Sequence, residues 1–131
     1  MTALAASVRD ERKRILVVDD SLIMRQLVKE IVNSDPDLEV VDTAENGRVA
    51  IQKVRQLDPD AVLLDITMPE MDGLAALKEI KKLDPNARVA MVTAMGQQAI
   101  VMEALRAGAK DFVLKPFQPD RMIGALQKLL A

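Results

Sequence analysis

The sequence predicts an α/β protein, a doubly wound domain in which helices cover both faces of a parallel β-sheet. Short apolar runs of strand length alternate with longer stretches of helical spacing along the chain. Several of the short runs are apolar at successive positions, as strands buried on both faces of a sheet require. The connections are short, so successive strands should be joined by right-handed crossovers and lie parallel.

Five runs rich in β-branched residues are predicted as strands. In chain order they cover residues 15–18, 38–41, 61–64, 89–92 and 112–114. A β-sandwich that exposes one face of each sheet would alternate apolar and polar residues instead, so the pattern favours a buried parallel sheet.

Five helices are predicted to follow these strands. The first carries two apolar rows, Ile23, Leu27, Ile31 and Met24, Val28, Val32, and the third carries Leu74, Leu77, Ile80 and Leu83. The other three are predicted at residues 49–57, 97–107 and 119–130. Asp-Pro pairs follow the first three helices, where proline cannot continue a helix, and Gly108 ends the fourth.

The composition limits the chemistry that this chain can perform. It has 131 residues without Cys or His, which excludes disulfides, thiol catalysis, Ser-His-Asp triads and His-ligated metals. Its 18 basic and 20 acidic residues give a net charge of −2, so nucleic acid is not an expected partner. No apolar run reaches the roughly 20 residues that span a bilayer, so we expect a cytoplasmic protein with no membrane insertion.

The length of the chain fits one domain with a short tail. Residues 1–14 end in a run of charges, RDERKR, and are expected to form a disordered N-terminal tail. Residues 15–131 are expected to form the folded domain.

Polar residues stand where four of the predicted strands end. Asp19 and Asp20 follow the first strand and Asp65 follows the third, while Thr93 and Lys115 follow the fourth and the fifth. Taken singly, each of these residues could have a purely structural role, as a helix cap, a loop residue or a strand residue. Because the carboxyl ends of parallel strands meet where doubly wound proteins bind ligands, their shared location favours one functional site.

These residue types point to phosphoryl transfer assisted by a metal ion. Carboxylates brought close together repel one another unless a pKa rises or a cation binds, and a site made only of oxygen ligands suits Mg²⁺. Lys115 offers a positive charge and Thr93 a hydroxyl donor for a bound phosphoryl group. We therefore predict that Asp65 is a nucleophile that forms an acyl phosphate.

Four segments of the sequence carry a more specific signal. They are ILVVDDSLIMR from residue 15, VLLDITMPEMDGL from residue 62, VTA from residue 92 and AGAKDFVLKPF from residue 107. Together they resemble the receiver domain of two-component response regulators, and most of all the single-domain chemotaxis regulators. The resemblance covers about residues 15–130 and implies a flavodoxin-like (βα)5 fold with the sheet order 2-1-3-4-5.

The resemblance implies a role for each carboxylate. Asp65 would be the phosphoacceptor, and Asp19 and Asp20 would be the acidic pair that organises Mg²⁺. The backbone carbonyl of Thr67 would be a further metal ligand. Lys115 would form an ion pair with the phosphoryl group.

The resemblance also implies a switch and a set of partners. A histidine kinase would supply the phosphoryl group from a phosphohistidine, since this chain has no His. Thr93 would then hydrogen-bond the phosphoryl group, and Phe112, where the best-known chemotaxis regulators have Tyr, would turn inward. The surface of residues 97–130 would signal by contact with a protein such as the flagellar motor switch or a phosphatase. The chain would be a phosphoacceptor and not a turnover enzyme, and a monomer unless phosphorylation causes it to dimerise.

Other functions stay open from the sequence. A receiver can be a phosphorelay intermediate, a phosphate sink, or the regulatory half of a methylesterase or transcription factor, although with Ala131 as the last residue a stand-alone signalling protein is expected. A phosphatase of the haloacid dehalogenase type would need a second Asp where this chain has Thr67. A flavin-binding protein would usually need aromatic residues to stack on the flavin, and this chain has two Phe and neither Tyr nor Trp.

Overall fold

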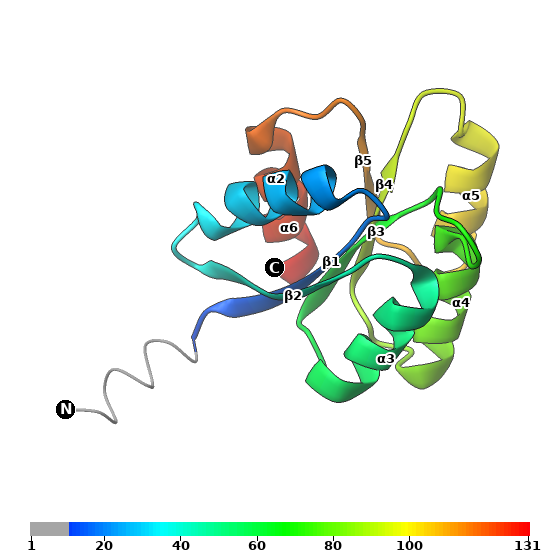
Figure 1. Ribbon diagram of the computed structural model, residues 1–131, viewed down its shortest axis with the longest axis horizontal. Coiled ribbons are helices and arrows are strands. Elements are labelled where there is room, and N and C mark those ends of the chain that lie inside the picture. Colours follow the sequence, from blue (N-terminus) through cyan, green and yellow to red (C-terminus); the bar gives the residue numbers. More distant parts are fainter. Residues whose placement is uncertain (1–10) are drawn as a thin grey trace.

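A computed structural model describes residues 11–131, which form a five-stranded parallel sheet and five helices (Figure 1). The strands are β1 (Lys13–Val18), β2 (Leu38–Ala44), β3 (Ala61–Asp65), β4 (Val89–Thr93) and β5 (Asp111–Leu114). The helices are α2 (Leu22–Asn33), α3 (Gly47–Leu57), α4 (Gly73–Leu83), α5 (Gln98–Arg106) and α6 (Pro119–Leu130). All strand pairs are parallel and the order is β2-β1-β3-β4-β5, so the predicted fold class and strand order are confirmed.

The helices form a layer on each face of the sheet. Helices α2 and α6 pack on one face, and α3, α4 and α5 pack on the other (Figure 1). The core is divided in the same way: Ile15, Val17 and Leu63 belong to the cluster beneath α2 and α6, whereas Leu16 and Leu64 belong to the opposite cluster. Neighbouring residues of one strand point to opposite faces, and both faces are covered. That arrangement explains why these strands are apolar at successive positions.

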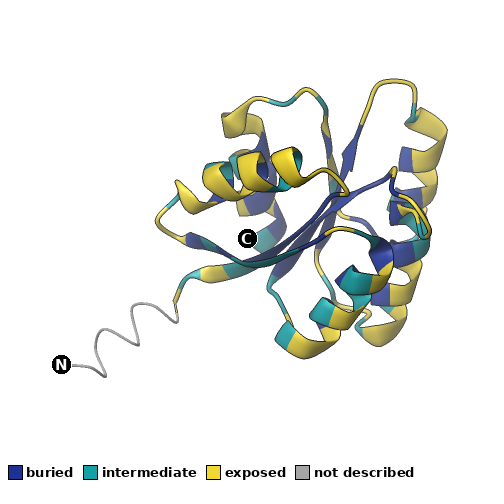
Figure 2. Cartoon of the chain, viewed as in Figure 1, coloured by how far each residue is buried: buried dark blue, intermediate teal, exposed yellow. Residues whose placement is uncertain are grey.

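The central and edge strands differ in burial (Figure 2). Every residue of β3 and β4 is buried, as are the last four residues of β1. The edge strands β2 and β5 are only partly buried. Burial on both faces is therefore confirmed for the central strands and does not extend to the two edges. Strand β2 also continues three residues beyond the predicted 38–41, because Asp42 and Thr43 can occupy the half-exposed positions of an edge.

The first strand begins two residues before the predicted boundary. Of the expected tail, residues 1–14, the first ten lie outside the described part of the chain, and Lys13 and Arg14 belong to β1. Arg14 is held there because its backbone N–H donates to Asp60 at 2.8 Å and its guanidinium donates to the carbonyl of Leu57 at 2.7 Å.

Helix α2 differs from the prediction in which residues it buries. Val28 and Val32 are buried, but Ile23 is 78% exposed and Leu27 is 44% exposed. Of the predicted apolar row Ile23, Leu27 and Ile31, the first two residues therefore face outward, whereas Ile31 is partly buried against the core. Among the helices of residues 11–131, none combines the length and the apolar character needed to cross a bilayer.

The start of α4 is pressed against the end of β3. The backbone N–H of Gly73 donates to the carbonyl of Ile66 at 2.7 Å. A Cβ at Gly73 would lie 2.1 Å from the carbonyl oxygen of Asp65, so only glycine fits at this position. The Asp72 side chain caps the helix by accepting from the backbone N–H of Ala75 at 2.8 Å. These contacts fix the backbone that carries Asp65.

Candidate functional site

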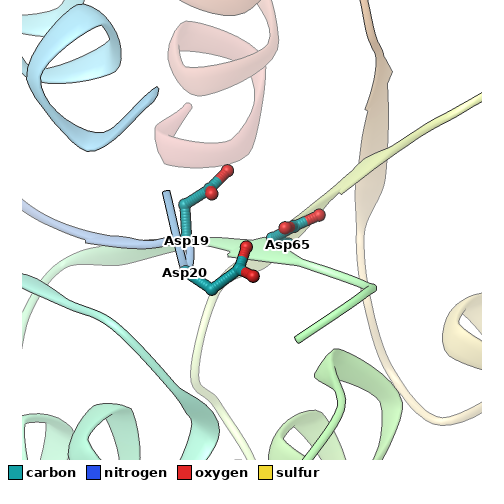
Figure 3. A group of neighbouring side chains, drawn as sticks. All are labelled: Asp19, Asp20 and Asp65. Atoms are coloured by element: carbon teal, nitrogen blue, oxygen red, sulfur yellow. The ribbon is translucent and has the colours of Figure 1, made fainter. Parts of the chain in front are cut away.

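Three aspartates meet at the carboxyl edge of the sheet (Figure 3). Asp19 and Asp20 follow β1, and Asp65 is the last residue of β3. Because β1 and β3 are neighbours in the sheet, one carboxylate oxygen from each residue lies within 4.8 Å of the others. Asp19 and Asp65 are buried, with 4% and 6% of their surface exposed, whereas Asp20 is exposed.

Lys115 brings a positive charge from the end of β5 into this group. Its Nζ lies 3.1 Å from Oδ2 of Asp19 and 3.4 Å from Oδ1 of Asp65. A single ammonium group is thus shared between two buried carboxylates, and Asp20 adds a third negative charge. The sequence-predicted residues Asp19, Asp20, Asp65 and Lys115 are therefore brought together.

Asp19 is held in place by neighbours that follow it in the chain. Its Oδ1 accepts a hydrogen bond from the backbone N–H of Ser21 at 2.9 Å. Its backbone carbonyl accepts one from the guanidinium of Arg25, in the first turns of α2, at 2.9 Å. Ser21 also caps α2, because its hydroxyl accepts from the backbone N–H of Met24 at 3.2 Å. The cap and the acidic pair are parts of one local structure.

The pKa values of Asp65 and Lys115 are both shifted by burial and by neighbouring charges. Burial raises the pKa of Asp65 to about 6; the charge of Lys115 lowers this pKa and the charge of Asp19 raises it further. For Lys115, burial lowers the pKa, but the hydrogen bond to Asp19 and the charges of Asp65 and Asp19 outweigh it, so the pKa is raised. Lys115 therefore stays charged, while Asp65 lies in an environment that disfavours its negative charge.

The donor set fits a hard divalent cation. Asp19, Asp20 and Asp65 offer carboxylate oxygens, two of these residues being buried and one exposed, and their ligand atoms are close enough to share one ion. Oxygen ligands of this kind suit Mg²⁺, which keeps several water ligands and needs only one or two carboxylates. The pKa of Asp65, which is raised first by burial and then by the charge of Asp19, also fits, because a bound cation would favour the ionised carboxylate.

Thr93 lies at the same edge but its hydroxyl is bound elsewhere. Its Oγ1 donates to Oε1 of Gln97 at 2.9 Å, and Nε2 of Gln97 donates to Oγ1 of Thr67 at 2.6 Å. Thr67 is exposed, and the role of its backbone carbonyl as a metal ligand stays a prediction. Phe112 is 37% exposed on β5 and stands outside the carboxylate group.

Phe112 and Thr93 line one apolar pocket of about 260 Å³, between β5 and α5. The pocket also includes Ala94, Val101 and Leu105. The two residues predicted to form the switch therefore share a space, although they do not share the polar site.

Two residues of the site, Gln97 and Arg25, were missed by sequence reasoning. Gln97 stands just before α5, where a polar residue is ordinary and carries no signal of its own. Arg25 belongs to the segment ILVVDDSLIMR, so its place one turn after the acidic pair was an available signal.

Comparison with known proteins identifies the family. The response regulator receiver domain matches residues 15–127. The chain belongs to the response regulator receiver family. This receiver domain is 55% identical over 115 residues to the chemotaxis protein CheY of Listeria monocytogenes, covering 88% of this chain and 96% of that protein.

The receiver domain also matches a solved structure and a larger enzyme. It superposes on a chain from the CheX–CheY–BeF3–Mg²⁺ complex of Borrelia burgdorferi with a TM-score of 0.86 and 35% identity, covering 91% of this chain and 90% of that chain. A protein-glutamate methylesterase of Nocardioides is 48% identical over 105 residues, which are 79% of this chain and 29% of the enzyme. The match to single-domain CheY proteins is therefore the stronger one, as predicted.

Proposed function

We propose that this protein is a stand-alone response regulator that accepts a phosphoryl group on Asp65 and signals by protein contact in chemotaxis. One observation supports this function above the others. A buried carboxylate at the end of β3 has two further carboxylates within 4.8 Å and a lysine ammonium at 3.4 Å. The 55% identity to a CheY protein over nearly its whole length supports the chemotaxis role.

The chemical step is a transfer between two side chains. A carboxylate oxygen of Asp65 attacks the phosphorus of a phosphohistidine on a sensor kinase. The new P–O bond forms while the P–N bond breaks, and the electron pair returns to the imidazole nitrogen, which takes up a proton. Since this chain contains no His, the donor is another protein. Asp65 is phosphorylated stoichiometrically, so the protein is not a turnover enzyme.

Asp19, Asp20 and Asp65 are the residues that would hold Mg²⁺, with the backbone carbonyl of Thr67 as a further ligand. When bound, the ion supplies positive charge that offsets the carboxylates and the incoming phosphoryl oxygens. The relative from Borrelia burgdorferi was solved with BeF3 and Mg²⁺, which supports this assignment.

Lys115 and Thr93 are proposed to contact the phosphoryl group after transfer. The Lys115 ammonium already lies beside Asp65, so it can pair with a phosphoryl oxygen after a small movement. The Thr93 hydroxyl must leave Gln97 to reach the same group. Its movement would change the pocket that it shares with Phe112, and so allow Phe112 to turn inward.

The output surface is proposed to comprise α5, β5 and α6, within residues 97–130. Phe112, Met102 and Leu114 are exposed apolar residues on this surface, at 37%, 50% and 44%. Binding partners would include the kinase and a protein of the CheX kind, since a CheY relative was solved in complex with CheX. We propose that these contacts take place in the cytoplasm, with residues 15–131 acting as the receiver domain.

Intact-protein mass spectrometry after incubation with acetyl phosphate and Mg²⁺ tests this function. We expect one phosphoryl group on the wild type and none on Asp65→Ala or after EDTA. Asp37→Ala is the matched control, because it removes an exposed aspartate far along the chain from the site. Phosphorylation that persists in Asp65→Ala would contradict the assignment, and failure with both acetyl phosphate and a phosphorylated chemotaxis kinase would contradict the function.

A further inference from the structure

Gln97 connects the two loops that leave β3 and β4. Its Oε1 accepts hydrogen bonds from the Thr93 hydroxyl at 2.9 Å and from the backbone N–H of Ala94 at 2.8 Å. Its Nε2 donates to the hydroxyl of Thr67 at 2.6 Å. One amide side chain thus joins the residue two positions after Asp65 to the last residue of β4.

The donor and acceptor directions of this amide are fixed by its partners. A backbone N–H can only donate, so the atom that faces Ala94 must be the amide oxygen. The NH₂ group is then left for Thr67, and the Thr93 hydroxyl must donate to the amide oxygen. The alternative acceptor for Thr93, the carbonyl of Ala94, is farther away at 3.3 Å.

The Thr93 hydroxyl has one hydrogen, so it can donate one strong hydrogen bond at a time. In the structure the hydroxyl donates to the amide oxygen of Gln97. Under the proposed function it must serve a phosphoryl oxygen on Asp65. The amide oxygen of Gln97 and the phosphoryl group therefore compete for the same hydrogen.

We propose that Gln97 is a positioning residue that holds Thr93 in the unphosphorylated arrangement and thereby slows the phosphorylation of Asp65. This inference rests on the proposed function and concerns the regulation of the same site. Gln97 also lines the pocket shared by Thr93 and Phe112, so its bond to Thr93 joins the chemical site to the output surface. When Thr93 leaves, Gln97 keeps the N–H of Ala94 as a partner, so the release strands no buried group.

The rate of phosphorylation by acetyl phosphate in Mg²⁺ tests the proposal. Gln97→Met keeps the length of the side chain and removes its three hydrogen bonds, including the one from Thr93. The loss of the bond from Thr93 should raise the rate about 2- to 10-fold, the range expected for one neutral hydrogen bond. Gln97→Glu offers Thr93 and Ala94 a stronger, charged acceptor and should lower the rate. Gln98→Met and Gln98→Glu are matched controls, because the exposed Gln98 lines the same pocket but is not a hydrogen-bond partner of Thr93. The second of them reports the effect of the added charge alone.

Two further measurements separate this role from a structural one. In a Thr93→Val background there is no hydroxyl to hold, so Gln97→Met should no longer change the rate. Hydrolysis of the acyl phosphate, in which water attacks phosphorus and the P–O bond to Asp65 breaks to release phosphate, should proceed at the wild-type rate in Gln97→Met. The reason is that Thr93 has already left Gln97 in the phosphorylated protein. Circular dichroism and urea unfolding verify that each variant is folded.

The possible outcomes each decide the question. A higher rate in Gln97→Met that disappears with Thr93→Val supports the proposal. An unchanged rate in Gln97→Met, or an equal increase in the Thr93→Val background, overturns it while leaving the proposed function intact. A wild type that accepts no phosphoryl group from acetyl phosphate or from a kinase overturns both.

Discussion

Replacing Asp65 with asparagine should stabilise the metal-free protein at neutral pH. The side chain is 6% exposed, and burial raises its pKa from an ordinary 3.8 to about 6. The folded protein therefore binds a proton more tightly than the unfolded chain does, so stability falls as the pH rises from about 4 to above 6. Asparagine has nearly the shape of the protonated carboxyl group and carries no charge at any pH, so it avoids this loss.

The size of the effect follows from the shift of the pKa. A shift of one unit corresponds to about 1.4 kcal/mol, so the shift of roughly two units corresponds to about 3 kcal/mol at pH values well above 6. At pH 4 and below, the carboxyl group of the folded protein is protonated, and the two proteins should have nearly the same stability. The difference in the free energy of unfolding should therefore grow from near zero at pH 4 to about 2–3 kcal/mol at pH 8.

Urea unfolding followed by far-ultraviolet circular dichroism, in EDTA between pH 4 and pH 8, measures this difference. Comparing the two proteins at each pH cancels the titration of the other groups. Asp37→Asn provides a control for the loss of one exposed negative charge. A difference that stays constant with pH, or an Asp65→Asn variant that is less stable than the wild type at pH 8, would show that burial does not destabilise the Asp65 carboxylate.

Four other perturbations follow from the structure. Lys115→Met should destabilise the protein at pH 7 by about 1–3 kcal/mol in urea unfolding, because Asp19 and Asp65 would lose their shared cation; an unchanged midpoint would mean that the ion pairs contribute nothing. Gly73→Ala should lower the urea midpoint strongly, because its Cβ would lie 2.1 Å from the carbonyl of Asp65. Gly124→Ala, with no atom within 4 Å of its Cβ inside α6, should instead stabilise by about 0.5–1 kcal/mol. Mg²⁺ at ten times its dissociation constant should stabilise the wild type by about 1.4 kcal/mol, and Asp65→Asn should reduce this gain; equal gains in both proteins would place the ion elsewhere.

The carboxylate site was predictable from the sequence because it follows from the geometry of a parallel sheet. Polar residues that follow buried strands lie at the ends of those strands, and the carboxyl ends of parallel strands lie at one edge of the sheet. The position of Asp65 after the apolar run 61–64 therefore predicts that it lies at the same edge as Asp19, and the strand order implied by the resemblance makes the two residues neighbours. The same rule placed Lys115 at this edge, although only the structure shows that it is shared between two carboxylates.

Other features could not be read from the sequence because they depend on packing. The helical period of α2 predicts a helix, but the width of its buried face depends on how much of it α6 and the sheet cover. Leu27 and Ile23 are left exposed for this reason. The role of Gln97 depends on how its side chain is oriented toward Thr67, a residue in another loop and 30 positions earlier in the sequence. No periodicity or motif relates residues this far apart, so the sequence does not predict the hydrogen bonds of the polar side chain before α5.

The site combines charges that the protein alone does not balance. The Nζ of Lys115 lies 3.1 Å from Oδ2 of Asp19 and 3.4 Å from Oδ1 of Asp65. Its positive charge is therefore shared with Asp19 and does not offset the charge of Asp65 alone. With three carboxylates and one ammonium, the group has a formal charge of −2 when all are ionised. The start of α4 at Gly73 packs closely against the backbone of Asp65, and the backbone N–H of Ser21 donates to Asp19, so local contacts hold these two aspartates near each other. The folded protein therefore holds a net negative charge, with unfavourable repulsion among the carboxylates, at the position where a cation would bind. Because folding already brings the carboxylate ligands together, cation binding does not have to provide the free energy for assembling them.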